Sequence, residues 1–408
     1  MLSHSPIIRY RLAYIFAMHW WSFFAQYHKW VRPEVFEAVR KIVACRTPVL
    51  GFHLYGCPSC GFMHIKPHSC KSRFCPTCGK QATDQWADHV LNNLLDVHYH
   101  HLVFSVPWEL RPIILLNRKV TLNLLAQAAV KSIQDWAKSQ CGMCMGIILV
   151  LHTFGSDLKF HPHLHVIVTG GGLSLDGTRW IALNPKFLMP HSGLKKRWRY
   201  NVVTLLREQN KKGLLRFPST ASYLKKTPCF NSFLNKIYQY VWYVFIGASL
   251  VDPGPSIHYV GRYTKRAVLA EYRITFYDGK HIRFQYRDYA AGGKTTYKTL
   301  SVNAFIGRLI RHIPDKHFPM IRHAGLFANR HKATYLPLCR AALGHKEEPS
   351  PEPVPTTWQQ RQTEYTGRDP LICPRCQTPL VLYEVAFGTH RPLHLLWEYV
   401  HRQPLAPG

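Results

Sequence analysis

The chain has 408 residues and 47% hydrophobic content, enough for a substantial core and for two or three domains. It carries 52 Lys and Arg against 22 Asp and Glu, a net charge of +30 at pH 7, which favours nucleic acid as the partner. No apolar run reaches the length of a membrane helix, so no membrane partner is expected, and the few carboxylates argue against an enzyme that holds two metals with clustered Asp and Glu.

Cysteine pairs dominate the first part of the chain, which otherwise is predicted to be helical up to about residue 95. Two Cys-x-x-Cys pairs supply four thiols at the spacing of one tetrahedral zinc site, namely Cys57, Cys60, Cys75 and Cys78. Clustering of this kind, unlike a disulfide framework, fits a reducing compartment. We therefore predict a structural Zn²⁺ that displays Lys71 and Arg73 toward DNA, and Cys70 either replaces one ligand or stays free.

The middle of the chain alternates strand and helix signals. A strand is predicted over residues 101–106, a helix over 117–139, and further strands over 146–151 and from residue 160. This order is typical of an antiparallel sheet with flanking helices, an α+β fold.

The third of these strands, FHPHLHVIVTGGG, begins at Phe160 and carries two histidines two residues apart. Because side chains alternate along a strand, Leu164, Val166 and Val168 point one way while His163 and His165 share the other face. One cation can bridge such a pair, although the chain has 25 histidines and the pair could also be surface decoration.

A later segment, HYVGRYTKR, places Tyr259 and Tyr263 four residues apart, so that both phenols lie on one face of a helix. Gly261 between them costs about 1 kcal/mol of helix propensity relative to alanine, which suggests that another group approaches closely there. The alternative is two ordinary half-buried tyrosines. The positive charges around the phenols come from Arg262, Lys265 and Arg266.

The rest of the second half has weaker signals. Basic runs at 195–200 and 211–216 are either DNA contacts or solvated faces. A hairpin is expected around Asp278-Gly279 and a helical region over 303–343. A Pro-rich acidic linker follows, and beyond it Cys373 and Cys376 form a pair without a clear partner pair.

Taken together, these blocks resemble the two-tyrosine rolling-circle insertion-sequence transposases of the HUH endonuclease superfamily. CPSCG and SCKSRFCPTCG look like the zinc-binding domain of that family, and VFSVPWELR, LHTFGSDLKFHPHLHVIVTGGGLSLDG, YVGRYTKR and IRHAGLFANRHK look like successive blocks of its transposase domain. The resemblance covers most of the chain. It implies an HUH endonuclease-like sheet preceded by a small helical zinc-binding domain.

The resemblance also implies a mechanism. His163 and His165 would hold Mg²⁺ or Mn²⁺ against a phosphate of single-stranded DNA, and Tyr259 or Tyr263 would displace the 3′-oxygen to leave a 5′-phosphotyrosine. Because Mg²⁺ prefers more ligands than two imidazoles, a third is expected, and the candidates are His152, which would end the neighbouring strand, His161 and His258.

Three segments are expected: a zinc-binding DNA-binding domain over 1–95, a catalytic domain over 96–345, and a linker and tail over 346–408. The predicted function is a bacterial, cytoplasmic and nucleoid-associated DNA transposase that acts on single-stranded element ends and target. The alternatives are another HUH nickase, either a plasmid replication initiator or a relaxase, and a non-catalytic zinc DNA-binding regulator.

Overall fold

The computed structural model describes residues 11–265, 268–289, 291–344 and 357–388, without the side chains of 80–82 and 262–265. It divides the chain into two compact units, one formed by residues 1–78 and 348–408 and the other by 79–347. The sequence prediction ended the first domain at residue 95 and set the tail apart. In the structure, the helix that begins at Gly79 belongs to the second unit, and the tail belongs to the first.

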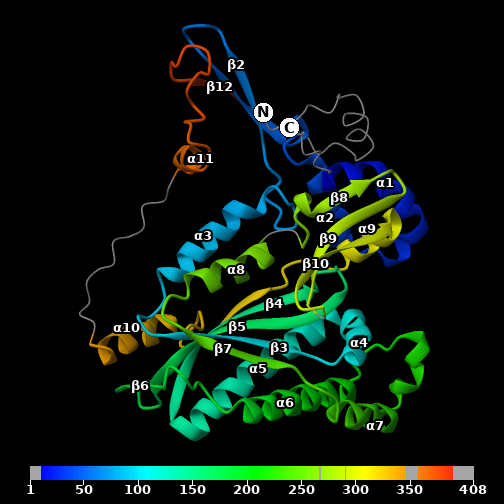
Figure 1. Ribbon diagram of the computed structural model, residues 1–408, viewed down its shortest axis with the longest axis vertical. Helices are drawn as coiled ribbons and strands as arrows, with labels where there is room; N and C mark the ends of the chain where they lie inside the picture. The colour runs from blue at the N-terminus through cyan, green and yellow to red at the C-terminus, as the bar shows by residue number, and fades with distance from the viewer. Residues whose placement is uncertain (1–10, 266–267, 290, 345–356, 389–408) are drawn as a thin grey trace. The chain divides into compact units, whose positions relative to one another are not determined.

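The first unit combines helices with a small sheet. Its helices and strands are α1 (Leu12–Tyr27), α2 (Pro33–Ala44), β1 (Gly51–Gly56), β2 (Met63–Pro67), α11 (Trp358–Thr366) and β12 (Val381–Phe387). The three strands form an antiparallel sheet in the order β12, β1, β2, so a strand from the tail pairs with the N-terminal hairpin (Figure 1). The sequence prediction described this domain as helical and missed the sheet, in which β1 pairs with the nearby β2 on one side and with β12, more than 300 residues away, on the other.

A six-stranded antiparallel sheet forms the centre of the second unit, in the order β11, β4, β5, β3, β7, with β6 paired to one end of β5. The strands are β3 (Tyr99–Ser105), β4 (Met143–Phe154), β5 (Phe160–Ser174), β6 (Trp180–Ala182), β7 (Val244–Leu250) and β11 (Ile321–Gly325). The predicted α+β antiparallel sheet is therefore confirmed. β11 was expected to be helical, and it is a five-residue edge strand whose conformation depends on pairing with β4.

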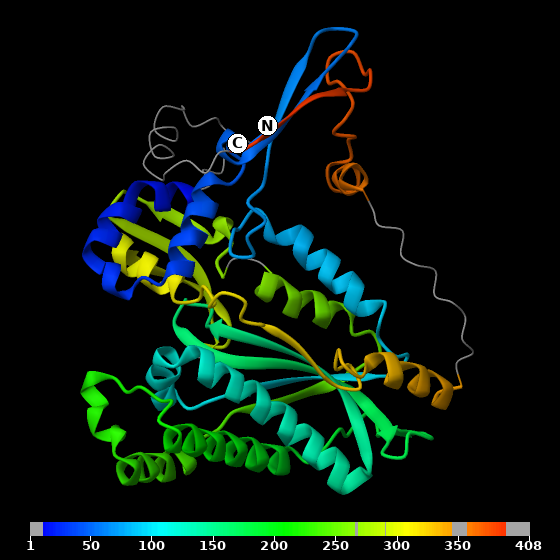
Figure 2. The same cartoon turned by 180° about the vertical axis from the view of Figure 1, so that it is seen from behind.

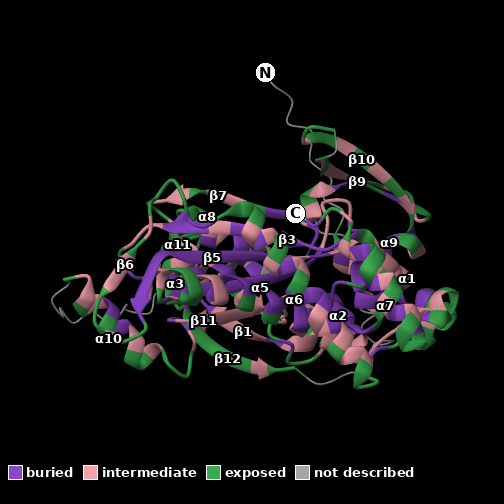
Figure 3. Ribbon diagram, turned by 90° about the horizontal axis from the view of Figure 1, so that it is seen from below, coloured by how far each residue is buried: buried purple, intermediate pink, exposed green. Residues whose placement is uncertain are grey.

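Helices cover both faces of this sheet. The helices of the second unit are α3 (Gly79–Leu91), α4 (Arg111–Leu116), α5 (Arg118–Cys141), α6 (His191–Lys211), α7 (Thr227–Tyr238), α8 (Gly254–Lys265), α9 (Val302–Ile310) and α10 (Lys332–Ala342). Figures 1 and 2 show α5, α6 and α7 on one side and α3 and α8 on the other. Figure 3 shows buried residues along β5 between these layers. Buried side chains of α5 and α6 pack against Phe104, Leu149 and Val166, and those of α3 and α8 pack near Ile148 and Ile167.

The hairpin predicted at Asp278-Gly279 is also confirmed. β8 (Ile274–Tyr277) and β9 (His281–Asp288) are antiparallel, and Gly279 adopts φ 88°, a value that glycine tolerates best. A third strand, β10 (Lys294–Ser301), extends the sheet. Short 3₁₀ helices occur at His28–Trp30, Pro48–Leu50, Trp108–Leu110, Ser219–Lys225 and Glu271–Arg273. Among the helices of the described ranges, none has the length and hydropathy needed to cross a membrane.

Candidate active site and metal centres

The histidine pair lies on β5, the middle strand of the large sheet. Leu164, Val166 and Val168 belong to the core beneath α5 and α6. Because side chains alternate along a strand, His163 and His165 lie on the opposite face, the one that carries α8. The sequence prediction that the two imidazoles share one face agrees with this arrangement.

A third imidazole comes from the neighbouring strand, since His152 of β4 is the register partner of His163. The ring centre of His152 lies 5.2 Å from that of His163 and 4.5 Å from that of His165, and the latter two rings are 5.0 Å apart. One nitrogen of each ring lies within 4.8 Å of the others, and within the described residues this group includes neither His161 nor His258. Of the three candidates for a third ligand, the geometry selects His152.

The environment of these rings keeps them uncharged. Burial, reinforced by the neighbouring imidazoles, holds the pKa of His152 and of His165 well below the ordinary range. Burial also lowers the pKa of His163. Neutral imidazole is the form that binds a metal, so the three rings are ready to act as ligands without losing a proton first.

Hydrogen bonds orient two of the rings. Nδ1 of His163 lies 2.8 Å from the carbonyl oxygen of His161 and donates to it, which leaves Nε2 for the cluster. Nδ1 of His165 lies 2.8 Å from Nε2 of His101, a second contact of the kind that fixes the tautomer of a metal-binding histidine. Three oriented nitrogen donors fit a divalent ion such as Mn²⁺, or Mg²⁺ with water molecules completing its coordination.

Tyr259 brings a phenol to the same place. Its ring centre lies 6.0 Å from that of His165, nearly perpendicular to it, and the side chain is 41% exposed. Tyr263 follows one turn later on α8, and its side chain lies outside the described residues. The same holds for the side chains of Arg262 and Lys265 and for the whole of Arg266.

Gly261 fixes the position of α8. A Cβ atom at this position would lie 2.5 Å from the Trp86 ring of α3, closer than real Cβ atoms come. The close approach expected from the sequence is therefore that of a neighbouring helix. Glycine here lets α3 and α8 pack together two residues after Tyr259.

We expect Gly261→Ala to lower the free energy of unfolding by about 1 to 2 kcal/mol, because the cost of overpacking exceeds the gain of about 1 kcal/mol in helix propensity. Cleavage should fall at least about tenfold, since a shift of α8 moves Tyr259 away from the histidines. Urea unfolding and a cleavage assay measure the two effects. Gly193→Ala is the control, because its Cβ would meet only Pro190 at 3.6 Å; an equal loss in both variants would contradict this role of Gly261.

An open cleft of about 810 Å³ lies beside the histidines. His161 and His163 form part of its wall, and the exposed aromatic residues Trp108, Tyr243 and Tyr289 form another part. Unpaired bases stack on such rings with little regard to sequence.

Arg111 also lines this cleft, and the sequence prediction did not include it. Burial is the main reason why the pKa of His161 falls to about 3, and the nearby His163 and Arg111 lower it further. Arg111 also lowers the pKa of His163. The guanidinium therefore lies near the imidazoles. The sequence signal for it is the block VFSVPWELR, whose resemblance to the transposase family gives its arginine no role.

Two other predicted DNA contacts, Lys71 and Arg73, belong to the first unit. Lys71 is exposed and Arg73 half-buried, in the loop between β2 and α3, where burial lowers the pKa of Arg73. The basic run at 195–200 is part of α6, on the face of the sheet opposite to the imidazoles. Within this run, the guanidinium carbon of Arg199 lies 3.9 Å from the ring centre of Tyr238.

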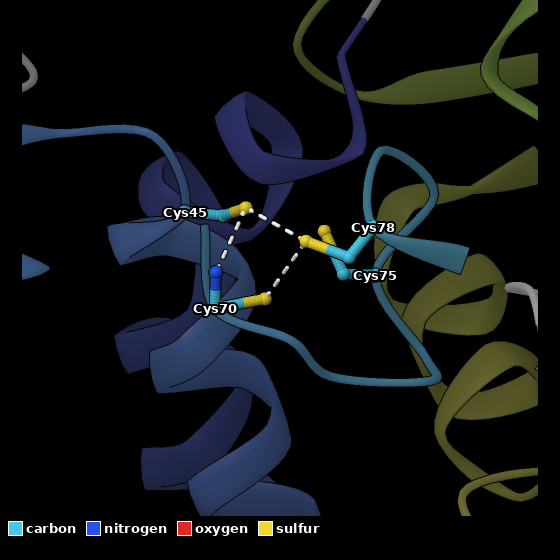
Figure 4. Close-up of side chains that lie close together, drawn as sticks. All are labelled: Cys45, Cys70, Cys75 and Cys78. Carbon is cyan, nitrogen blue, oxygen red and sulfur yellow. Dashed lines mark hydrogen bonds between the residues drawn. The ribbon is translucent and has the colours of Figure 1, made fainter. Parts of the chain in front are cut away.

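The eight thiols of the first unit form two groups of four, and this corrects the predicted zinc site. The first cysteine cluster consists of Cys45, Cys70, Cys75 and Cys78, and the second of Cys57, Cys60, Cys373 and Cys376. Figure 4 shows the first, in which Sγ of Cys78 lies 3.3 Å from that of Cys45 and 3.6 Å from that of Cys70.

The hairpin explains why the predicted quartet is split. Cys57 and Cys60 occupy its tip, between the end of β1 and the start of β2. Cys70 follows β2 at the base, where Cys45 ends α2. The six residues of β1 separate the tip of the hairpin from its base by about 20 Å. One ion therefore cannot bind both the Cys57–Cys60 pair and the Cys75–Cys78 pair. Cys70 is thus a member of the first cluster.

The comparison with protein families gives two matches. Residues 146–334 match a family described as "Putative transposase", and residues 15–106 match one described as "Transposase zinc-binding domain". The first match contains all three imidazoles and Tyr259. The second contains the first cysteine cluster and half of the second.

Two relatives that match most of the chain agree with these family matches. "Putative transposase y4qJ" of Sinorhizobium fredii is 34% identical over 86% of this chain and 89% of its own length. "Transposase for insertion sequence element IS801" of Pseudomonas savastanoi pv. phaseolicola is 33% identical over 85% of this chain and 82% of its own length. No solved structure gives a significant match.

The two family matches and these relatives identify a DNA transposase with an N-terminal zinc-binding domain. The chain belongs to the family of insertion-sequence transposases that includes the IS801 protein, the IS91 type.

Proposed function

We propose that this transposase nicks and rejoins single-stranded DNA through a 5′-phosphotyrosine intermediate during rolling-circle transposition. The observation that carries the proposal is the group of three neutral imidazoles beside the phenol of Tyr259. His163 also lines the cleft, so a strand bound there would reach the proposed metal ligands.

In the first step, the phenol oxygen of Tyr259 or Tyr263 attacks phosphorus in line with the 3′-oxygen. A bond forms between phosphorus and the tyrosine oxygen, the bond to the 3′-oxygen breaks, and the proton lost by the phenol ends on the 3′-hydroxyl. One phosphodiester replaces another, so the reverse reaction can join a new 3′-end without ATP. Two tyrosines can hold two ends, one from the donor and one from the target.

The chain's own residues prepare this step. His152, His163 and His165 would hold Mn²⁺ or Mg²⁺, and such an ion supplies charge that polarises the scissile phosphate. His101 and the carbonyl of His161 keep two of these rings turned toward the cluster. Arg111 adds a fixed positive charge to stabilise the additional negative charge on the phosphate oxygens.

The cleft favours single-stranded DNA as the substrate. Exposed Trp108, Tyr243 and Tyr289 offer faces for unpaired bases, whereas paired bases are stacked on one another and cannot use them. The net charge of +30 supplies attraction to the backbone.

We expect Arg111→Gln to reduce cleavage roughly a hundredfold, because it removes a charged donor from the reacting phosphate. Arg111→Lys should recover part of this loss. Initial rates with labelled oligonucleotides measure both effects. Arg179→Gln removes the same charge from the exposed turn before β6 and should cleave normally; equal activity of the Arg111 and Arg179 variants would exclude Arg111 from the site.

Labelled single- and double-stranded oligonucleotides from the ends of the encoding element test the proposal. The protein is incubated with each in the presence of Mn²⁺, Mg²⁺ or a chelator and run on a denaturing gel. We expect a covalent product with the single strand and either metal only. Binding that shifts the DNA on a native gel, with no covalent product under any condition, would instead support a non-catalytic regulator.

A further inference from the structure

The second cysteine cluster joins two parts of the chain that are more than 300 residues apart. Cys57 and Cys60 lie at the tip of the β1–β2 hairpin, and Cys373 and Cys376 lie just before β12. The Sγ atoms of Cys57 and Cys376 are 3.3 Å apart, those of Cys60 and Cys373 are 3.6 Å apart, and all four lie within 4.8 Å of one another.

The two halves of the cluster have the same backbone structure. In the first, the amide of Cys57 donates to Phe62 O at 2.8 Å and the amide of Gly61 donates to Cys57 O at 3.1 Å. In the second, Cys373 donates to Thr378 O at 2.9 Å and Gln377 donates to Cys373 O at 3.0 Å. The tail therefore repeats the turn of the hairpin tip.

A left-handed residue follows the second cysteine of each turn, with φ 70° at Gly61 and 61° at Gln377. Glycine tolerates this conformation, whereas a residue with a Cβ atom is strained in it. Gln377 therefore needs another interaction to keep this conformation. Such turns direct both thiols of a pair to one side, which suits a shared tetrahedral ion.

The small sheet holds the two turns against each other. β12 pairs with β1 over its whole length, from Gly51 opposite Phe387 to Gly56 opposite Val381, so both turns meet at the same end of the sheet. Lys66 of β2 lies 3.0 Å from the ring centre of Trp358 in α11, a second contact between hairpin and tail.

The distances distinguish a metal site from disulfides. A disulfide needs sulfur atoms about 2.05 Å apart, and none of the four thiols is bonded to another. Four thiolates around Zn²⁺ at about 2.3 Å lie about 3.8 Å from one another, close to the observed 3.3 and 3.6 Å.

We propose that Cys57, Cys60, Cys373 and Cys376 bind a second structural Zn²⁺, which fastens the C-terminal tail to the N-terminal hairpin. The region matched by the zinc-binding family ends at residue 106, so it does not contain two of the four ligands. This inference does not depend on the chemistry of the imidazole site. It predicts two zinc ions for each chain, one in each cysteine cluster.

Metal analysis of the purified full-length protein tests the stoichiometry. We expect two zinc ions per chain in the wild type and one in the double variant Cys373→Ser/Cys376→Ser. The control is Cys141→Ser/Cys229→Ser, which removes two thiols outside both clusters and should keep two ions. One zinc in the wild type, two in the tail variant, or iron in place of zinc would overturn the proposal.

Thiol alkylation of the wild-type protein tests the site without a variant. Cys376 is exposed, so as a free thiol it should react quickly with N-ethylmaleimide. A zinc-bound thiolate reacts slowly, so we expect mass mapping to find Cys376 protected until a chelator is added. Rapid labelling of Cys376 in the untreated protein, with no effect of the chelator, would show that no ion is bound there.

Discussion

Replacing both tyrosines, Tyr259→Phe with Tyr263→Phe, should abolish DNA cleavage while leaving DNA binding intact. The phenol oxygen is the proposed nucleophile, and its removal leaves no group that can form the phosphodiester, so the rate should fall by at least about 10³-fold. The ring of Tyr259 would still pack beside His165, because phenylalanine keeps its shape. Cleavage on denaturing gels and binding on native gels measure the two properties separately.

Single variants and a control sharpen this result. Tyr272→Phe removes a phenol that is 67% exposed and lies on a different helix, and it should cleave like the wild type. If one tyrosine starts the reaction, its single variant should lose the first nick, and the other should lose only the joining step. Cleavage that survives in the double variant would remove both tyrosines from the mechanism.

Replacement of a histidine should separate the two kinds of metal site. His163→Ala removes one of three nitrogen donors at the centre of the cluster, so metal-dependent cleavage should fall roughly a hundredfold or more. The zinc content should not change, because all eight thiols of the cysteine clusters lie in the other unit. Cleavage rates over a range of Mn²⁺ concentrations and metal analysis of the same preparation measure both.

His89→Ala provides the matched control, because this histidine is exposed on α3 and lies outside the group of three. It should keep both cleavage and zinc. Loss of zinc from the His163→Ala protein would mean that the imidazoles and thiols are not independent sites. Full activity of that protein would mean that the imidazoles are not used in cleavage.

The sequence predicted those parts of the site that depend on local geometry. The alternation of β5 determined which face His163 and His165 share, and it needed no knowledge of the neighbours. The position of His152 depended on the pairing of β4 with β5, so the sequence could only offer it among three candidates. Arg111 and His101 act on rings more than 40 residues away, and no spacing rule connects them to those rings.

The cysteines show more clearly which metal ligands the spacing of residues in the sequence cannot predict. Two nearby Cys-x-x-Cys pairs are the usual signature of one zinc site, and that rule grouped Cys57 and Cys60 with Cys75 and Cys78. In the folded chain, the length of the hairpin separates the pairs, and Cys60 lies next to Cys373, 313 residues away. β11 was missed for the same reason, because its short sequence becomes a strand only beside β4.

The measurement that tests the central claim most directly is peptide mass mapping of protein incubated with a single-stranded oligonucleotide from the element end and Mn²⁺. The proposed mechanism predicts a peptide from α8 whose mass has increased by the 5′-phosphorylated DNA fragment, with the modification on Tyr259 or Tyr263. A nicked oligonucleotide with no protein adduct, or an adduct on any other residue, would contradict it.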